Sequence, residues 1–344
     1  MLTLPVQGYS EQVRRISAMH HMYKKEDDLK YKENLKKKIL KLKKEKHAVI
    51  IVHNYQRDEV QDIADISGDS LALSQAAVKA DAKVIVFCGV DFMAESASIL
   101  NPDKIVLLPV KEAGCPMADM VTVERLKEKK KEYPDAAIVC YVNSSAVIKA
   151  ESDICCTSSN AIQIVQSLKD YEEVIFIPDK NLGRYVQQNV PDKKIILWEG
   201  FCPTHIRVSK EEILKAKEGH PEAEVVAHPE CNPDVLSVSD HICSTGGMFS
   251  YVKSSKSKEF IIATESGMLY RLRKDNPDKR FYVPTERLVC PTMKLTTLGW
   301  VAHSLEAMEY EVRISGNIRD KACKSLERML KVSGEKPGAG MAGY

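Results

Sequence analysis

The sequence predicts an α/β protein built from three homologous αβα three-layer sandwich domains in a pseudo-threefold arrangement. Short apolar runs rich in β-branched residues alternate with helical segments, a pattern typical of parallel sheets covered on both faces. Chemically similar residues also recur at a nearly constant interval: Cys115, Cys202 and Cys290 are spaced by 87 and 88 residues. A simple core demands no such interval, so we interpret it as one structural unit that occurs three times.

The predicted elements follow this division. The sandwich domains are expected over residues 46–120, 121–206 and 207–299. Residues 1–45 are expected to form a helical extension, because the stretch 26–46 is rich in Lys and Glu with apolar residues at helical spacing. Helices within 300–332 are expected to pack back on the first domain, and the Gly- and Ala-rich residues 333–344 to form a flexible tail.

Within each domain, strands are predicted at short apolar runs and helices at the segments between them. In the first domain, strands are expected at 48–53, 83–88 and 105–109, and helices at 58–66, 70–80, 91–100 and 122–132. In the second, strands are expected at 136–141, 154–156, 173–177 and 194–198, and helices at 144–150, 160–168 and 180–189. In the third, a helix at 209–218 precedes strands near 223–227, 241–243, 259–263 and 280–282, and helices at 295–308 and 318–332 close the fold.

Composition excludes several classes of protein. The chain has 344 residues, 44% of them hydrophobic and 28% charged, which is ordinary for a globular protein of two or three domains. A net charge of +2 argues against a nucleic-acid-binding surface, and neither a signal peptide nor an apolar run of about 18 residues is present. We therefore expect a cytoplasmic protein with reduced cysteines and no nucleic-acid or membrane partner.

The three regularly spaced cysteines are the first candidate site. Proline follows Cys115, Cys202 and Cys290 directly, and it disfavours a helical conformation of the cysteine before it. Ligands of open α/β sheets bind beyond the carboxyl ends of the strands, so three such loops could aim their thiols at one point. Three thiolates suit copper(I), or a [4Fe–4S] cluster with one open iron, whereas structural zinc would normally recruit a fourth ligand. Three ordinary core cysteines are the alternative.

Polar residues at the predicted strand ends form a second candidate layer. His53, Tyr141 and His228 end apolar runs at intervals of 88 and 87 residues. Because residues i and i+2 of an extended segment share a face, three pairs could project into one cavity. These pairs are His53 with Tyr55, Tyr141 with Asn143, and His228 with Glu230. Such groups suit proton transfer, although a single histidine at a strand end is more often simply hydrogen-bonded.

Hydroxyl groups at predicted helix starts form a third layer. Ser70, Ser158 and Ser244 are spaced by 88 and 86 residues, and Thr245 adjoins the last. Free N–H groups at helix N-termini suit carboxylates or phosphate, although plain N-capping is the alternative. His205, three residues after Cys202, could reach the same cavity. No P-loop or dinucleotide fingerprint is present, so neither ATP nor NAD is expected.

Over roughly residues 46–310 the sequence resembles the quinolinate synthase family of NAD biosynthesis. Ten ordered motifs carry the resemblance, among them HNYQ at 53–56, GCPMA at 114–118, WEGFCPTH at 198–205, HPEC at 228–231 and STGGM at 244–248. The resemblance implies three αβα domains around one [4Fe–4S] cluster held by Cys115, Cys202 and Cys290. It further implies condensation of iminoaspartate with dihydroxyacetone phosphate to quinolinate, with loss of phosphate and water and with the open iron as Lewis acid.

The resemblance also implies roles for individual residues. The catalytic group would be Tyr55, Glu230, Tyr141 and His228, with Tyr141 closing over the site. Substrate would be bound by His53, Ser70, Asn143, Ser158, His205, Ser244 and Thr245. Some members of the family carry Cys-x-x-Cys at the third cysteine, but here Thr292 and Met293 follow Cys290-Pro291, so no local disulfide is expected. A transient contact with the enzyme that produces iminoaspartate is a further expectation.

Two other functions stay open at this point. One is a non-catalytic iron–sulfur sensor or redox protein, which a fourth thiolate or a DNA-binding module would favour. The other is a zinc-stabilised protein that binds a sugar or an anion. An absorption spectrum separates the two metals, because an iron–sulfur cluster is coloured and zinc is colourless.

Overall fold

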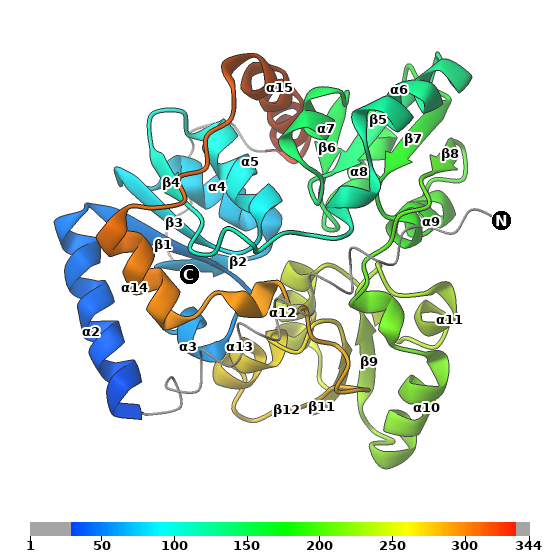
Figure 1. The fold of residues 1–344 in the computed structure, drawn as a ribbon. Helices are drawn as coiled ribbons and strands as arrows, with labels where there is room; N and C mark the ends of the chain where they lie inside the picture. Colours follow the sequence, from blue (N-terminus) through cyan, green and yellow to red (C-terminus); the bar gives the residue numbers. More distant parts are fainter. Residues whose placement is uncertain (1–28, 335–344) are drawn as a thin grey trace.

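A computed structural model describes residues 29–334, in which three parallel four-stranded sheets lie around a common centre (Figure 1). Across the first sheet the order is β2 (Ile66–Gly68), β1 (Ala48–His53), β3 (Val84–Cys88) and β4 (Ile105–Leu107). Across the second it is β6 (Ile154–Cys156), β5 (Ala137–Tyr141), β7 (Glu173–Ile177) and β8 (Lys194–Leu197). Across the third it is β10 (His241–Ile242), β9 (Glu224–Ala227), β11 (Glu259–Ala263) and β12 (Arg280–Tyr282). The shared order confirms the predicted fold class of repeated αβα sandwiches.

Helices flank each sheet. Those of the first unit are α3 (Asp58–Gln61), α4 (Ser70–Lys79) and α5 (Asp91–Leu100). Those of the second are α6 (Val123–Glu132), α7 (Ala146–Ala150), α8 (Ala161–Ser167) and α9 (Lys180–Asn189). Those of the third are α10 (Lys210–Gly219), α11 (Pro233–Leu236), α12 (Thr245–Ser254) and α13 (Met268–Asp275). Every residue of β3 and of β5 is buried, as expected for a sheet covered on both faces.

Three further helices pack on the outside of these units. α14 (Leu298–Ala307) lies against α2 (Leu29–Glu45) and β3 of the first unit. α15 (Gly316–Val332) packs on α7 and β6 of the second unit and also contacts α5 of the first (Figure 1). The exact domain boundaries stay a prediction. No helix among the described residues is both long and apolar enough to span a membrane.

The first unit differs from the prediction in one place. A helix was predicted over 58–66, but α3 ends at Gln61 and the chain then forms β2. Ile66 pairs with Ile51 of β1, and the Asp65 carboxylate accepts a hydrogen bond from the N–H of Ile50 at 2.8 Å. Tertiary pairing therefore decides the conformation of a segment too short to show a strand period. Residues 1–28 of the predicted extension and 335–344 of the predicted tail lie outside the described residues.

Candidate functional site

One cavity collects the strand ends of all three units. His53 and Tyr141 are the last residues of β1 and β5, and His228 directly follows β9. Of the predicted site residues, the cavity lining includes His53, Tyr55, Ser70, Cys115, Tyr141, Asn143, Ser158, Cys202, His205, His228, Glu230, Thr245 and Cys290. Ser244 is not among the lining residues. Its hydroxyl instead accepts a hydrogen bond from the N–H of Gly247 at 3.1 Å and caps α12.

The three cysteine loops share one local structure. Each cysteine lies three residues before a short 3₁₀ helix, namely η2 (Ala118–Met120), η3 (His205–Arg207) and η4 (Met293–Leu295). The carbonyl of each cysteine accepts a hydrogen bond from the N–H four residues later, at 3.2–3.3 Å. The proline after each cysteine and this turn together fix the loop, so that all three cysteines line the cavity.

The donor set of this cavity fits a thiophilic metal group. Burial raises the pKa of Cys115, Cys202 and Cys290, and each of the first two is raised further by neighbouring cysteines of this set. Without a cation the thiols are therefore protonated at neutral pH, whereas a bound metal deprotonates a coordinating thiol outright. All ten cysteines of the chain are free thiols. Cys202, His205 and Glu230 also bring one ligand atom each to within 4.8 Å of one another, so a single metal ion could be held there as well.

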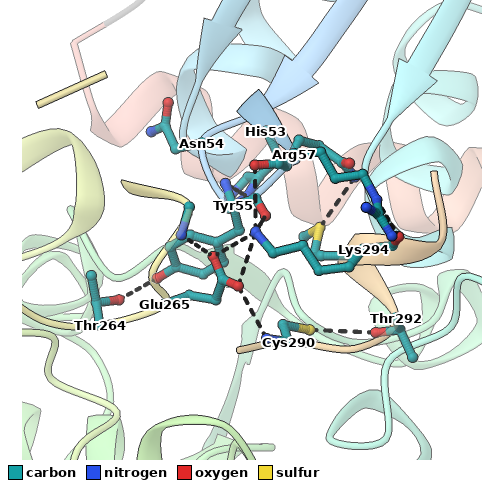
Figure 2. A network of polar contacts seen from close by, with 12 residues as sticks. His53, Asn54, Tyr55, Arg57, Thr264, Glu265, Cys290, Thr292 and Lys294 are labelled. Atoms are coloured by element: carbon teal, nitrogen blue, oxygen red, sulfur yellow. Dashed lines mark hydrogen bonds and ion pairs between the residues drawn. The ribbon is translucent and has the colours of Figure 1, made fainter. Parts of the chain in front are cut away.

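A continuous chain of side chains connects a carboxylate to a phenol in the cavity. Glu230 Oε2 lies 2.7 Å from His205 Nδ1. His205 Nε2 lies 2.8 Å from Thr264 Oγ1, which in turn lies 2.7 Å from the Tyr55 hydroxyl. The Tyr55–Thr264 contact is visible in Figure 2. Each link is within hydrogen-bonding distance, so a proton could be passed between Glu230 and Tyr55 through two intermediate side chains.

The surroundings of the cavity shift the pKa of Glu230 and the pKa values of the two tyrosines in opposite directions. Burial alone would raise the pKa of Glu230, but the neighbouring His205 and His228 hold that pKa well below its ordinary value. Burial, and then the charge of Glu230, raises the pKa of both Tyr55 and Tyr141. At neutral pH the carboxyl group is therefore ionised and both phenols keep their protons. Oε1 of Glu230 is buried without a hydrogen-bond partner among the described residues, and so it can accept from a ligand.

His53 and His228 are neutral bases held in fixed orientations in the cavity. Burial and then Lys294 lower the pKa of His53 to about 3, and burial also lowers the pKa of His228. His53 Nδ1 accepts a hydrogen bond from the N–H of Tyr55 at 3.2 Å. His228 Nε2 lies 3.2 Å from Ser158 Oγ, and the rings of His205 and His228 stack with centroids 4.7 Å apart.

Several buried polar residues at the site were missed by sequence reasoning. Thr264 is part of the relay, and Asp179 and Glu265 accept hydrogen bonds from the backbone N–H groups of two of the cysteines, at 3.0 and 3.1 Å. The two carboxylates could have been found from the sequence, because Asp91, Asp179 and Glu265 are spaced by 88 and 86 residues. The same search for repeats that singled out the cysteines therefore finds them. Thr264 has no counterpart of this kind.

Comparison with known proteins gives concordant matches over most of the chain. The family model described as quinolinate synthetase A protein matches residues 37–331. A protein of Geobacter sp. (strain M21) named quinolinate synthase is 56% identical over 300 residues, covering 87% of this chain and 98% of the relative. Equally named proteins of Methanosarcina barkeri and Thermodesulfovibrio yellowstonii are 56% and 54% identical, covering 86% and 85% of this chain and 96% of each relative.

Proposed function

Because the chain belongs to the quinolinate synthase family, we propose that it condenses iminoaspartate with dihydroxyacetone phosphate to quinolinate, with loss of phosphate and water. It is an enzyme whose substrates are small molecules and whose product feeds NAD biosynthesis. The observation that carries the proposal is the meeting of three repeated cysteine loops with a set of acid and base groups in one cavity.

In this proposal Cys115, Cys202 and Cys290 hold a [4Fe–4S] cluster. Three soft thiols from three separate loops match the usual cluster ligands, one fewer than the four that would saturate it. When bound, the cluster supplies an iron without a protein ligand, which polarises substrate oxygens as a Lewis acid.

Proton transfer is assigned to the relay between Glu230 and Tyr55. The Glu230 carboxylate, ionised at neutral pH, accepts a substrate proton, directly or through His205. Tyr55, which keeps its proton, donates to a leaving hydroxyl group. Tyr141 closes over the substrate, and the neutral His228 is a second base beside Glu230.

Substrate anions are assigned to the helix starts that open on the cavity. Ser70 and Thr245 are the first residues of α4 and α12, where the positive end of the helix dipole favours a carboxylate or phosphate. Ser158 adds a hydroxyl from the second unit. His53 and Asn143 donate hydrogen bonds to substrate carbonyls and carboxylates. Both ring nitrogens of His205 are engaged by Glu230 and Thr264, so His205 acts on the substrate through these partners. Ser244 supports this end of the site through its cap of α12.

We also propose that the reaction takes place in the cytoplasm, with a transient contact to the enzyme that supplies iminoaspartate. The unstable imine must reach the cavity before water hydrolyses it. Contact between the two enzymes would shorten that path.

An anaerobic assay tests the proposed reaction. Protein reconstituted with iron and sulfide is mixed with dihydroxyacetone phosphate and freshly generated iminoaspartate, and quinolinate is measured by chromatography. We expect broad absorption near about 400 nm and quinolinate formation that ceases in the Cys202→Ser variant. A coloured protein that forms no quinolinate would contradict the enzyme and favour an iron–sulfur sensor. Full activity of a colourless zinc protein would contradict the cluster.

A further inference from the structure

A buried ion pair, whose carboxylate belongs to the lining of the cavity, has no part in the proton relay. Glu265 is completely buried, and its carboxylate lies 3.1 Å from Nζ of Lys294 (Figure 2). The two residues come from different segments, the turn after β11 and the helix η4. A buried charge pair is retained only where its remaining hydrogen-bonding capacity is satisfied, so the partners of each group indicate what the pair holds in place.

The carboxylate of Glu265 holds the third cysteine loop. Its Oε1 accepts a hydrogen bond from the backbone N–H of Cys290 at 3.1 Å, and its Oε2 accepts from that of Gly267 at 2.7 Å. In addition, the N–H of Ser266 donates to the carbonyl of Leu288 at 2.8 Å. The turn after β11 thus holds the cysteine loop at two positions, Leu288 and Cys290.

The ammonium group of Lys294 holds a different loop, the one that carries Tyr55. Nζ donates to the carbonyl of Tyr55 at 2.5 Å and lies 3.4 Å from that of Gln56. Arg57 donates in the reverse direction, from Nε to the carbonyl of Lys294 at 2.7 Å. The loop after β1 and the loop of Cys290 are therefore connected through the side chain and the backbone of one lysine (Figure 2).

The close packing at this point requires a residue without a side chain. A Cβ atom on Gly267 would lie 2.7 Å from Lys294 Nζ, 2.8 Å from Glu265 Oε2 and 2.9 Å from the carbonyl oxygen of Gln56. All three segments therefore converge on one glycine. This close contact fixes the position of the Tyr55 loop relative to that of the Cys290 loop.

The three-fold repeat shows that this pair is a specialisation of the third unit. Asp179, the equivalent of Glu265 in the second unit, also accepts from a cysteine N–H, that of Cys202 at 3.0 Å. The residue four positions after each cysteine is Asp119, Ile206 or Lys294, so only the third loop offers a cation there. A carboxylate thus binds the cysteine N–H in both the second and the third unit. The additional connection to the Tyr55 loop is made by Lys294 of the third unit.

We propose that Glu265 and Lys294 are positioning residues that keep the Cys290 thiol and the Tyr55 phenol in a fixed mutual geometry. The inference rests on the proposed function, which makes Cys290 a cluster ligand and Tyr55 a proton donor. Neither Glu265 nor Lys294 has to touch the substrate for this role. Loss of the lysine leaves the Glu265 charge buried without its partner and frees the carbonyl of Tyr55, so both loops should loosen together.

Lys294→Met tests the proposal, with Lys274→Met as the matched control. Lys274 is an exposed lysine of the same third unit, paired with Asp62 at the surface. After anaerobic reconstitution, iron and sulfide per chain, the rate of cluster loss to a chelator, kcat and KM are measured. We expect Lys294→Met to lose its cluster about 10-fold faster and kcat to fall about 10-fold with little change in KM, as is usual when support of a metal ligand is removed.

Additional variants separate positioning from general destabilisation. Lys294→Arg keeps the charge and should restore part of both losses, and Glu265→Gln keeps an acceptor for the Cys290 N–H and should have a smaller effect. If Lys294→Met matches Lys274→Met in cluster loss and kcat, while Cys290→Ser lacks a cluster, the positioning role is wrong and the proposed function stands. If Cys290→Ser keeps a normal cluster, the ligand assignment itself is wrong, and with it the premise of this inference.

Discussion

At the scale of single residues, Thr264 connects a histidine to a phenol through one hydroxyl group. It is fully buried, and its Oγ1 lies 2.7 Å from the Tyr55 hydroxyl and 2.8 Å from His205 Nε2. Thr264→Val keeps the shape of the side chain and removes this hydroxyl. We expect kcat to fall by about 10²-fold, the lower end of the usual contribution of proton transfer, with unchanged iron content. Anaerobic steady-state kinetics and iron analysis measure the two quantities.

The matched control for that variant is Thr122→Val. Thr122 is exposed and caps α6, where its hydroxyl accepts a hydrogen bond from the N–H of Arg125 at 3.3 Å. This change should lower stability by about 1 kcal/mol and leave kcat unaltered. A Thr264→Val enzyme with the kcat of the control would show that protons do not pass through this hydroxyl.

His53 makes the stability of the metal-free protein depend on pH. Its folded pKa is about 3, against 6.5 in an unfolded chain, so the unfolded state binds the extra proton as pH falls below 6.5. Stability contributed by neutral His53 is therefore complete above pH 6.5 and is lost toward pH 3. Between pH 6.5 and 5 this loss should amount to about 2 kcal/mol.

Urea unfolding of metal-free protein at several pH values measures this dependence. The His53→Gln variant should show a flatter decline from pH 6.5 to 5 than the parent protein. His303→Gln, which removes an exposed histidine paired with Glu309, should keep the parental slope. Equal slopes for His53→Gln and the parent would mean that His53 is not held neutral by its surroundings.

The site residues that recur at the interval of about 88 residues were predictable from the sequence. Cys115, Cys202 and Cys290 share an interval and a following proline, and these two features together distinguish them from the seven other cysteines. Thr264 and Lys294 carry no such mark, because threonine and lysine are common everywhere. Their contacts join segments that are 209 and 239 residues apart along the chain, and only tertiary structure brings these together.

At the scale of elements, each unit uses one lysine to close the end of a helix. Lys104 donates to the carbonyl of Ala80 at 2.7 Å after α4, and Lys279 donates to that of Ser255 at 2.8 Å after α12. In the second unit Lys193 donates to the carbonyl of Leu168 at 2.6 Å after α8, and also to that of Tyr171. A cation at this end satisfies free carbonyls and opposes the helix dipole.

Lys193→Met should therefore lower the free energy of unfolding by about 1 kcal/mol. Its neighbour Lys194 is the matched control, since it is exposed and its ammonium contacts Glu173 and the Tyr133 ring instead of a helix end. Lys194→Met should leave stability nearly unchanged. Urea unfolding of the three proteins gives the comparison, and equal midpoints for both variants would show that the helix end needs no cation.

Elements were predicted best where they are long and apolar. Strands such as β1 and β7 appeared at the predicted places because consecutive β-branched residues leave few alternatives. β2 was mistaken for the end of a helix, because three residues show no period and its pairing with β1 comes from the fold. α11 has only four residues, too few to show a helical period, and the sequence does not predict it.

At the scale of the whole molecule, the cavity belongs to no single unit. Each unit contributes one cysteine, so a group bound to all three would connect the three units at one point. A ligand that binds the folded protein and not the unfolded chain stabilises it in proportion to its affinity. Loading with iron and sulfide should consequently raise the thermal midpoint of the entire protein in one transition.

The three cysteines should then be equivalent despite their distance in sequence. We expect Cys115→Ser, Cys202→Ser and Cys290→Ser each to lose the cluster and the whole increase in thermal midpoint, because two thiols do not hold a cubane whose last iron is already open. Cys323→Ser on α15 should keep both, since that thiol lies outside the cavity lining. Anaerobic calorimetry with and without reconstitution measures the increase. If one of the three variants kept the full increase in thermal midpoint, a different set of thiols would have to hold the cluster. The cavity would then not be a metal site built from one cysteine of each unit.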